Sequence, residues 1–249
     1  MNKYINLERI EFVVTMCCTG RCRHCSEGSH HFSGCHIDGE LAARAIAEVS
    51  QHYNIKSLMT FGGEPLLYPE TVCTIHSAAK AADIPKREVI TNGYFSKNEN
   101  RIREVAQMLA DSGVNRVLLS VDAFHQETIP IEPVMIFAEA VRNTGVTLFL
   151  SPAWLISPED NNPYNNATHD LLKIFTDKDF YVSEGNIIFP QGNAKVLLAE
   201  YFDENSSVAN PYEEDPKQIR TLSFEPDGSV LGENIYDTYI LNIINNYKP

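Results

Sequence analysis

The sequence predicts an α/β protein whose core is a parallel sheet. Six short apolar segments, rich in β-branched and aromatic residues, alternate with five segments in which apolar residues recur at helical spacing. The expected strands are apolar along their whole length, as strands buried on both faces of a parallel sheet are. The alternation alone is compatible with an open doubly wound sheet and with a barrel.

Each expected element has a local signature. Leu41, Ala45 and Val49 share one helical face, and Asp38 is the expected N-cap of that helix. Pro69 suits the first position of the second helix. The expected strands span residues 11–16, 55–61, 88–91, 117–121, 146–150 and 186–189. The expected helices span residues 38–52, 99–111, 132–143 and 166–176, with one more that begins near residue 69.

The alternation stops after the sixth strand. Residues 199–218 are acidic and polar, and they predict a long loop. A Pro-Asp-Gly-Ser turn between short apolar runs predicts a hairpin at residues 221–231, and residues 238–246 predict a final helix. We therefore expect a core domain over residues 1–190 and a C-terminal extension over residues 191–249 that packs on it.

Composition narrows the class of protein. The 33 acidic and 20 basic residues give a formal net charge of −13, which argues against nucleic acid and against an anionic membrane surface as partners. The N-terminus has neither the apolar stretch nor the cleavage site of a signal peptide, so we expect a cytoplasmic protein with reduced thiols. Four of the six cysteines lie within nine residues, which indicates metal binding rather than disulfides.

The cysteine-rich loop after the first strand is the most informative feature. Cys18, Cys22 and Cys25 are separated by three and then two residues, and three soft thiolates suit an iron–sulfur cluster with one iron left free. Zinc is the alternative that the residues leave open. Its four ligands would come from Cys22, Cys25, Cys35, His24, His30, His31 and His36.

The spacing of the three cysteines resembles the signature of the radical S-adenosylmethionine (radical SAM) superfamily. The resemblance implies one 4Fe–4S cluster held by Cys18, Cys22 and Cys25, with the free iron chelating S-adenosylmethionine (AdoMet). It places His24, which precedes the last cysteine, near the adenine. Only Cys18 has the family spacing, so we expect Cys17 to be packed at the end of the strand.

A second motif, Gly62-Gly63-Glu64-Pro65, ends the second strand. Two glycines let a ligand approach the backbone closely, and the acceptors around them suit an ammonium group. The motif also resembles the family's Gly-Gly-Glu-Pro segment, which holds the methionine amino group of AdoMet. An ordinary turn from strand to helix is the alternative interpretation.

Polar residues also follow the third and fourth strands. The resemblance assigns contacts with AdoMet to Thr91, Asn92, Ser120 and Asp122. The alternative for each of these residues is a helix N-cap or an Asx-turn.

Three residues are candidates for catalysis on the substrate. His125 and Glu127 follow the fourth strand, where a solvated helix start is the alternative, and Cys35 is a candidate hydrogen-atom donor. Substrate identity cannot be derived from these residues.

The resemblance also implies the fold, a partial (β/α)6 TIM-type barrel over roughly residues 9–190 followed by a small C-terminal hairpin and helix. The tail resembles the SPASM-type tails of family members that carry extra clusters. No cysteine follows Cys73, so we expect a short member without an auxiliary cluster.

The resemblance implies that the cluster reductively cleaves AdoMet to a 5′-deoxyadenosyl radical, which abstracts a hydrogen atom from the substrate. A flavodoxin or ferredoxin is the expected reductant. We favour a peptide or protein substrate, although the first strand begins too early for a separate N-terminal peptide-binding domain. A small metabolite is the alternative substrate, and a zinc-binding interaction module is the alternative of another class.

Overall fold

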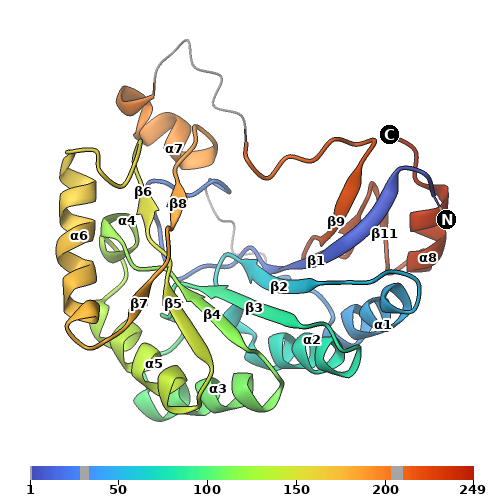
Figure 1. The fold of residues 1–249 in the computed structure, drawn as a ribbon, viewed down its shortest axis with the longest axis horizontal. Coiled ribbons are helices and arrows are strands. Elements are labelled where there is room, and N and C mark those ends of the chain that lie inside the picture. The colour runs from blue at the N-terminus through green and yellow to red at the C-terminus, as the bar shows by residue number, and fades with distance from the viewer. Residues whose placement is uncertain (1, 29–33, 203–209) are drawn as a thin grey trace.

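The computed structural model describes residues 2–28, 34–202 and 210–249, and a seven-stranded sheet forms its centre (Figure 1). The strand order is β7-β5-β4-β3-β2-β1-β9, and every neighbouring pair is parallel. The strands are β1 Ile5–Thr15, β2 Ser57–Gly62, β3 Lys86–Thr91, β4 Arg116–Leu119, β5 Thr147–Leu150, β7 Tyr181–Val182 and β9 Ile219–Phe224. The predicted α/β class with a parallel sheet is confirmed.

Helices cover the outer face of the sheet (Figure 1). The helices in the described ranges are α1 Gly39–Ser50, α2 Pro69–Ala81, α3 Glu99–Asp111, α4 Ala123–Gln126, α5 Ile131–Asn143, α6 Pro163–Thr176, α7 Gly192–Leu197 and α8 Ile240–Asn246. Of these, α7 lies apart from the outer face, beside β8 (Figure 1). Asp38 caps α1 as predicted, because its carboxylate accepts hydrogen bonds from the amides of Glu40 and Leu41. No helix within the described ranges is long and apolar enough to cross a bilayer.

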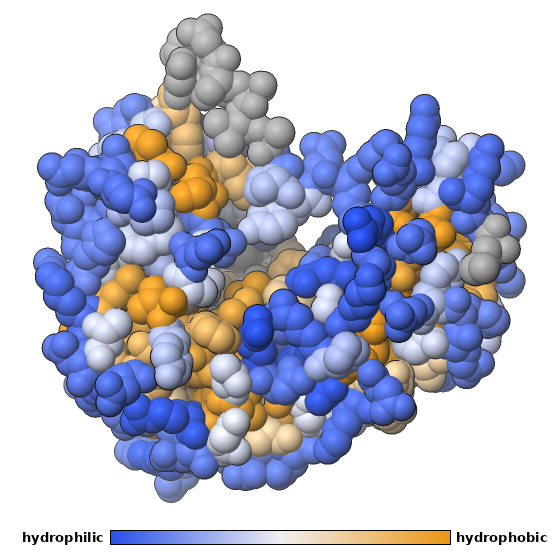
Figure 2. Space-filling view, viewed as in Figure 1, coloured by the Kyte–Doolittle hydropathy of each residue, from blue (hydrophilic) through white to orange (hydrophobic). Residues whose placement is uncertain are grey.

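The sheet is a partial barrel rather than a closed one. The edge strands β7 and β9 stand at opposite ends of the strand order, so the sheet does not close on itself. Figure 2 shows the resulting hollow between the arm with β8 and α7 and the arm with β9. Apolar side chains on the first of these arms, among them Ile187, Val196 and Leu197, are exposed. The predicted partial-barrel architecture is confirmed, with one open side.

The sixth strand was predicted at about the right residues but in the wrong sheet. Residues Asn186–Ile187 form β8, which pairs with β6 Ala153–Trp154 in a separate two-stranded sheet. The strand that extends the main sheet is β7, which has only two residues, and both are exposed. Such a short exposed strand lacks the buried apolar run by which strands are recognised.

The predicted C-terminal hairpin was also wrong in its pairing. Residues 221–224 belong to β9, which joins β1 in parallel. The chain turns back after β9, where the amide of Glu225 donates to the carbonyl of Ser229 at 2.9 Å, but β9 and the next segment do not form a two-stranded ladder. Phe224 stacks on Phe12 with ring centroids 4.6 Å apart, and this apolar contact draws β9 onto the sheet. After the predicted turn, Ser229–Val230 (β10) pairs with Glu233–Asn234 (β11).

The remaining C-terminal predictions have mixed outcomes. The final helix is confirmed as α8, whose apolar face packs in one core with β9 and α1. Residues Ala199–Tyr201 of the predicted long loop form a short 3-10 turn, and residues 203–209 of that loop lie outside the described residues. The division of the chain at residue 190 stays a prediction.

Candidate metal and cofactor site

The cysteine loop leaves β1 at the carboxyl edge of the sheet and is tied to the end of β2. The amide of Gly63 donates to the carbonyl of Thr15, and the amide of Glu64 donates to the carbonyl of Cys17, both at 2.7 Å. Cys17 is buried, as expected for a packed residue. The two motifs recognised in the sequence are therefore in direct backbone contact.

The thiols of the loop converge. A Cβ atom built on Gly20 would lie 3.3 Å from the sulfur of Cys22 and 3.7 Å from the sulfur of Cys18. Burial raises the pKa of Cys18 to about 11, and it also raises the pKa values of Cys22 and Cys25. The charge of Cys25 adds to the rise in the pKa of Cys18, and the charges of Cys18 and Cys25 add to the rise in the pKa of Cys22. Crowded thiols of this kind ionise when a cation compensates their charge, so the three sulfurs fit an iron–sulfur cluster.

Glycine is required at positions 62 and 63 because the end of β2 lies very close to the backbone at the base of the cysteine loop. Gly62 has a φ of +136°, and a Cβ there would lie 2.5 Å from the carbonyl oxygen of Thr15. A Cβ on Gly63 would lie 2.2 Å from the carbonyl oxygen of Cys17. The two glycines were expected to let a ligand approach the backbone closely. In the structure, the base of the cysteine loop makes this close approach.

The Glu64 carboxylate is fully buried and engaged with its own chain. It accepts hydrogen bonds from the amide of Leu66 at 2.9 Å, the hydroxyl of Thr91 at 2.7 Å and the amide of Asn92 at 2.8 Å. Burial raises its pKa to about 7 against the opposing effect of these donors. Glu64 therefore joins the end of β2 to the end of β3, and Pro65 begins the 3-10 turn Pro65–Leu67 beside it.

Asn92 connects the end of β3 to the cysteine loop. Its side-chain amide points at the sulfur of Cys18 at 3.5 Å and at the hydroxyl of Thr19 at 3.2 Å. Its side-chain oxygen accepts from the amide of Tyr94, which is the Asx-turn of the alternative interpretation. Asn92 shapes its own turn and lies against a predicted cluster ligand at the same time.

Asp122 is a buried helix cap. Its carboxylate accepts from the amide and from the ring Nδ1 of His125, at 2.9 and 2.8 Å, and from the amide of Ala153 at 3.0 Å. Burial by itself would raise the pKa of Asp122, but the charge and hydrogen bond of His125 outweigh it and lower the pKa to about 2. Ser120, also buried, precedes it at the end of β4.

His24 and His125 face each other beside Cys22. Their ring centroids are 4.8 Å apart, and His24 also packs on Phe124 at 5.1 Å. Burial and the nearby charge of His125 lower the pKa of His24 to about 4. Potential ligand atoms of Cys22, His24 and His125 all lie within 4.8 Å of one another.

The start of α4 and the residues after it run along the cysteine loop. The amide of Arg21 donates to the hydroxyl of Thr128 at 3.1 Å. Arg23 forms an ion pair with Glu127 at 3.1 Å. The candidate catalytic residue Glu127 therefore holds the loop in the structure, and His125 stands beside Cys22.

Sequence reasoning missed the segment that covers the other side of the loop. The side chain of Asn193 donates to the carbonyl of Cys22 at 3.1 Å, and its amide donates to the carbonyl of Cys25 at 2.9 Å. A Cβ on Gly192 would lie 2.3 Å from the carbonyl oxygen of Ser26. A Gly-Asn pair after a strand is too common to have singled these residues out.

The remaining candidates lie beside the end of β1, where His36 forms an isolated bridge with Thr15. The sulfur of Cys35 is 3.6 Å from the carbonyl of Pro226, in the turn after β9, and its own carbonyl accepts from Thr15. His36 stacks on Tyr68 with centroids 4.1 Å apart. His30 and His31 of the alternative zinc set lie outside the described residues.

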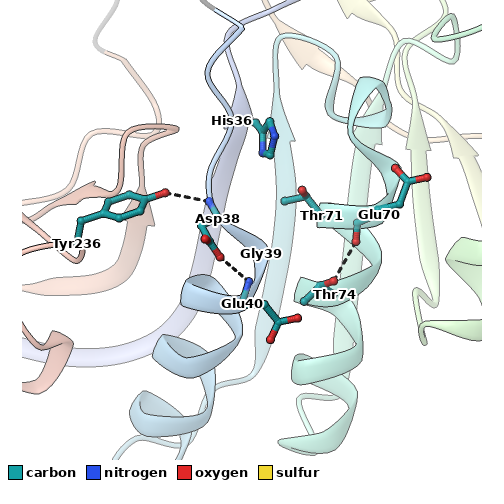
Figure 3. A pocket seen from close by; sticks show the side chains of 8 residues that line it. All are labelled: His36, Asp38, Gly39, Glu40, Glu70, Thr71, Thr74 and Tyr236. Atoms are coloured by element: carbon teal, nitrogen blue, oxygen red, sulfur yellow. Dashed lines mark hydrogen bonds between the residues drawn. The ribbon is translucent and has the colours of Figure 1, made fainter.

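An open surface pocket of about 460 Å³ is separate from this site. Figure 3 shows it between the first turns of α1 and α2, with Tyr236 at one side. The hydroxyl of Tyr236 accepts from the amide of Asp38, and Asp38 caps α1, so these polar groups are satisfied by the fold. None of the predicted cluster ligands lines it.

Comparison with known proteins points to one superfamily. A family model described as the radical SAM superfamily matches residues 12–147, more than half of the chain. A protein of Methanocaldococcus jannaschii named as a probable GTP 3′,8-cyclase is 28% identical over 121 residues. That match spans 49% of this chain and 38% of the relative, so the chain covers well under half of the relative's length.

Solved structures resemble the whole chain. The structure of native anSMEcpe with bound AdoMet has a TM-score of 0.62 at 15% identity, over 96% of this chain and 81% of that one. The structure of Streptococcus suis SuiB bound to the precursor peptide SuiA has a TM-score of 0.60 at 12% identity, over 97% and 65%. At these identities the likeness establishes the fold.

Proposed function

The chain belongs to the radical SAM superfamily, and from that premise we propose that it is an enzyme that holds one 4Fe–4S cluster through Cys18, Cys22 and Cys25 and uses it to cleave AdoMet. The observation that carries the proposal is the convergence of buried thiols around Gly20, at the carboxyl edge of a parallel sheet. Active sites of parallel barrels lie at this edge.

When bound, the cluster supplies the electron that splits AdoMet into methionine and a 5′-deoxyadenosyl radical, which takes a hydrogen atom from the substrate. The chain's own residues orient the reactants and exclude water. Asn92 directs an N–H group at the sulfur of Cys18. Glu64 holds the ends of β2 and β3 together, so that Gly62, Gly63 and Thr91 keep one arrangement.

We assign the AdoMet pocket to the carboxyl ends of β1 to β4. The acceptors of the Gly62–Pro65 segment suit the methionine ammonium group. His24, Ser120 and Asp122 lie on the side of β4 and α4, where the nucleoside half of AdoMet would fit. Cys35, beside the end of β1, stays a candidate hydrogen-atom donor, and His125 and Glu127 stay candidates for contact with the substrate.

A peptide or protein is the proposed substrate. The structure of SuiB with its precursor peptide resembles this chain over 97% of its length, C-terminal segment included. The face of the sheet turned away from the helices has a charged row, with Arg9, Glu11 and Arg116 partly exposed around the buried Glu88. The next row towards the carboxyl edge is apolar and partly exposed: Phe61, Ile90, Leu118 and Phe149. A wide hollow with both charged and apolar side chains suits an extended peptide better than a compact metabolite.

A nucleotide is the alternative substrate, because a relative is named a GTP 3′,8-cyclase. The match to that relative covers only 49% of this chain, whereas the match to the peptide-bound structure covers 97%. We therefore give the nucleotide less weight than the peptide. In either case we propose that the enzyme works in the cytoplasm, where thiols remain reduced and a flavodoxin or ferredoxin can deliver the electron.

Anaerobic reconstitution tests the cluster. Iron and sulfide should reach four of each per chain in the wild type and in Cys17→Ala, as a 4Fe–4S cluster requires. Each of Cys18→Ala, Cys22→Ala and Cys25→Ala should lose the cluster, and with it the formation of 5′-deoxyadenosine from AdoMet and dithionite. A full cluster in Cys22→Ala would refute the assignment.

The substrate is tested by coupling. The enzyme is supplied with GTP or with any small peptide encoded beside its gene, and 5′-deoxyadenosine is quantified by chromatography. The peptide should raise the yield of 5′-deoxyadenosine and change its own mass, whereas GTP should do neither. Stimulation by GTP alone would replace the peptide proposal with the nucleotide one.

A further inference from the structure

We infer that the cysteine loop and α4 together form a second, mononuclear metal site, in which Cys22, His24 and His125 bind one zinc-class divalent cation when the cluster is absent. The potential ligand atoms of these three residues lie within 4.8 Å of one another. One thiolate and two imidazoles are a donor set that zinc prefers. This set differs from the cluster ligands, because it takes only Cys22 from them and recruits His125 from α4.

An unpartnered nitrogen points independently to a ligand. The Nδ1 atom of His24 is buried and has no hydrogen-bond partner among the described residues. A buried imidazole nitrogen without a partner costs free energy, and a metal ion would satisfy it. Packing against Phe124 and His125 holds the ring of His24 in place.

His125 is prepared as a metal ligand by Asp122. Its Nδ1 atom lies 2.8 Å from the Asp122 carboxylate, which also caps the helix and is fully buried. A carboxylate that accepts a hydrogen bond from Nδ1–H leaves the Nε2 lone pair free, and histidines that bind metals usually have such a partner. Asp122 thus has a role in this site without touching the metal.

The geometry requires only a small adjustment. Zinc bond lengths and tetrahedral angles imply ligand atoms about 3.3–3.6 Å apart, so atoms now within 4.8 Å of one another must draw together by at most about 1.2–1.5 Å. Cys22 and His24 lie on a loop, which can make this movement more easily than a strand. Three protein ligands leave the fourth position to water or another small ligand.

Cys22 is shared, so the zinc ion and the cluster exclude each other. The inference stands on Cys22, His24 and His125 alone and does not require the proposed enzymatic function. It predicts instead that zinc competes with cluster assembly: protein loaded with zinc should take up iron and sulfide only after the zinc is removed.

The test is a comparison of two variants of the metal-free full-length chain. Zinc is titrated in competition with a chromophoric chelator, and cobalt is used to report the thiolate through its charge-transfer band. The wild type should bind one equivalent, with a single thiolate. His125→Ala should weaken zinc binding by roughly 10-fold or more and still accept the cluster, whereas Cys18→Ala should bind zinc normally and lose the cluster.

Asp122→Asn and His36→Ala complete the test. Asp122→Asn should weaken zinc binding by about 10–100-fold through His125, and His125→Gln provides the same test if Asp122→Asn does not fold. His36→Ala, outside the site, should change nothing. Zinc binding that is absent in the wild type, insensitive to His125→Ala or abolished by Cys18→Ala would overturn the inference. Failure of the wild type to take up a cluster would instead refute the proposed function.

Discussion

Glu64 shows how one side chain can organise a site without being free to bind a ligand. Its two oxygens accept three hydrogen bonds from the loops after β2 and β3. The contact predicted from the sequence was with the ammonium group of AdoMet. The structure adds a contribution to folding, since the same carboxylate determines the path of the backbone from Gly62 to Asn92.

Glu64→Gln should therefore destabilise the protein before any cofactor is added. Glutamine keeps one acceptor oxygen and replaces the other with an NH2 group. Either the amide of Asn92 or the amide of Leu66 would then face N–H groups and lose its acceptor. We expect a loss of about 1.5–3 kcal/mol in the free energy of unfolding. Urea denaturation of the metal-free protein measures it, with the exposed Glu70→Gln as control, which should change by no more than about 0.5 kcal/mol. Equal stability of both variants would restrict Glu64 to cofactor binding.

Gly63→Val should remove the cluster as well as weaken AdoMet binding. The added Cβ would lie 2.2 Å from the carbonyl of Cys17, so the base of the cysteine loop must move. We expect reconstituted iron to fall by more than about half, together with an overpacking cost of roughly 1–3 kcal/mol. Ser57→Val, at the other end of β2, is the control and should reconstitute normally. Normal iron content in Gly63→Val would mean that the loop can shift without losing its ligand geometry.

Two short elements far apart in the chain hold the cysteine loop. The α4 region contacts it through Thr128, Glu127 and His125. The segment before and within α7 contacts the opposite side through Gly192 and Asn193. The loop is therefore shaped by tertiary contacts, and the spacing of its cysteines is only part of what makes a cluster site.

Asn193→Ala tests the contact with α7. Only the hydrogen bond to the Cys22 carbonyl is lost, so the free energy of unfolding should fall by only about 1 kcal/mol. The cluster should nevertheless be lost roughly 10-fold faster to a chelator, because a residue that orients a ligand is removed. Decay of the cluster's visible absorption measures the rate. Asn166→Ala, in a surface contact on α6, is the control, and equal rates in the two variants would assign Asn193 to the fold alone.

The sequence predicted the strands and helices whose own residues show an apolar run or an apolar face. Five strands and the helices between them have apolar runs or faces, and Asp38 and Pro69 mark helix starts through local chemistry. The strand β7 was missed because Tyr181 and Val182 are exposed and form only two residues of sheet. The pairing of β9 with β1 was missed because a hairpin turn indicates where a strand ends and not which strand it joins.

The residues of the site also divide into those that the sequence alone could identify and those that only the fold brings together. The cysteine spacing and the Gly-Gly-Glu-Pro segment are contiguous, so the sequence could single them out. The meeting of His24 with His125 and the contact of Asn193 with Cys22 join distant positions. No periodic pattern records such a pair, and only the fold brings the residues together.

At the scale of the whole molecule, the pairing of β9 with β1 allows a test of the predicted domain boundary at residue 190. A chain that ends at Pro190 would lose the cover over the outer edge of β1 and the stacking of Phe224 on Phe12. We expect this fragment to aggregate, because an unpaired apolar strand edge is a template for other chains. Gel filtration and thermal melting measure it. A monomeric fragment with one cooperative transition would support an independent domain over residues 1–190.

Phe224→Ala tests the contribution of the stacking between Phe224 and Phe12 without shortening the chain. Removing a large, fully buried ring should cost about 3–5 kcal/mol. The exposed Tyr236→Ala is the control and should cost far less.

The pairing of the first strand of the sheet with the last has a consequence for synthesis. Ile5 leaves the ribosome 214 residues before its partner Ile219 (219 − 5). The units from β2 to β5 pair with near neighbours and can fold while translation continues. The outer edge of β1 must wait until β9 has been made, so the pairing of β1 with β9 is a highly non-local step of folding. A chain whose synthesis stops before β9 would have the strands from β1 to β5, a complete cysteine motif and one unpaired, aggregation-prone strand edge. We therefore expect the growing chain to depend on chaperones until β9 has been made and has paired with β1.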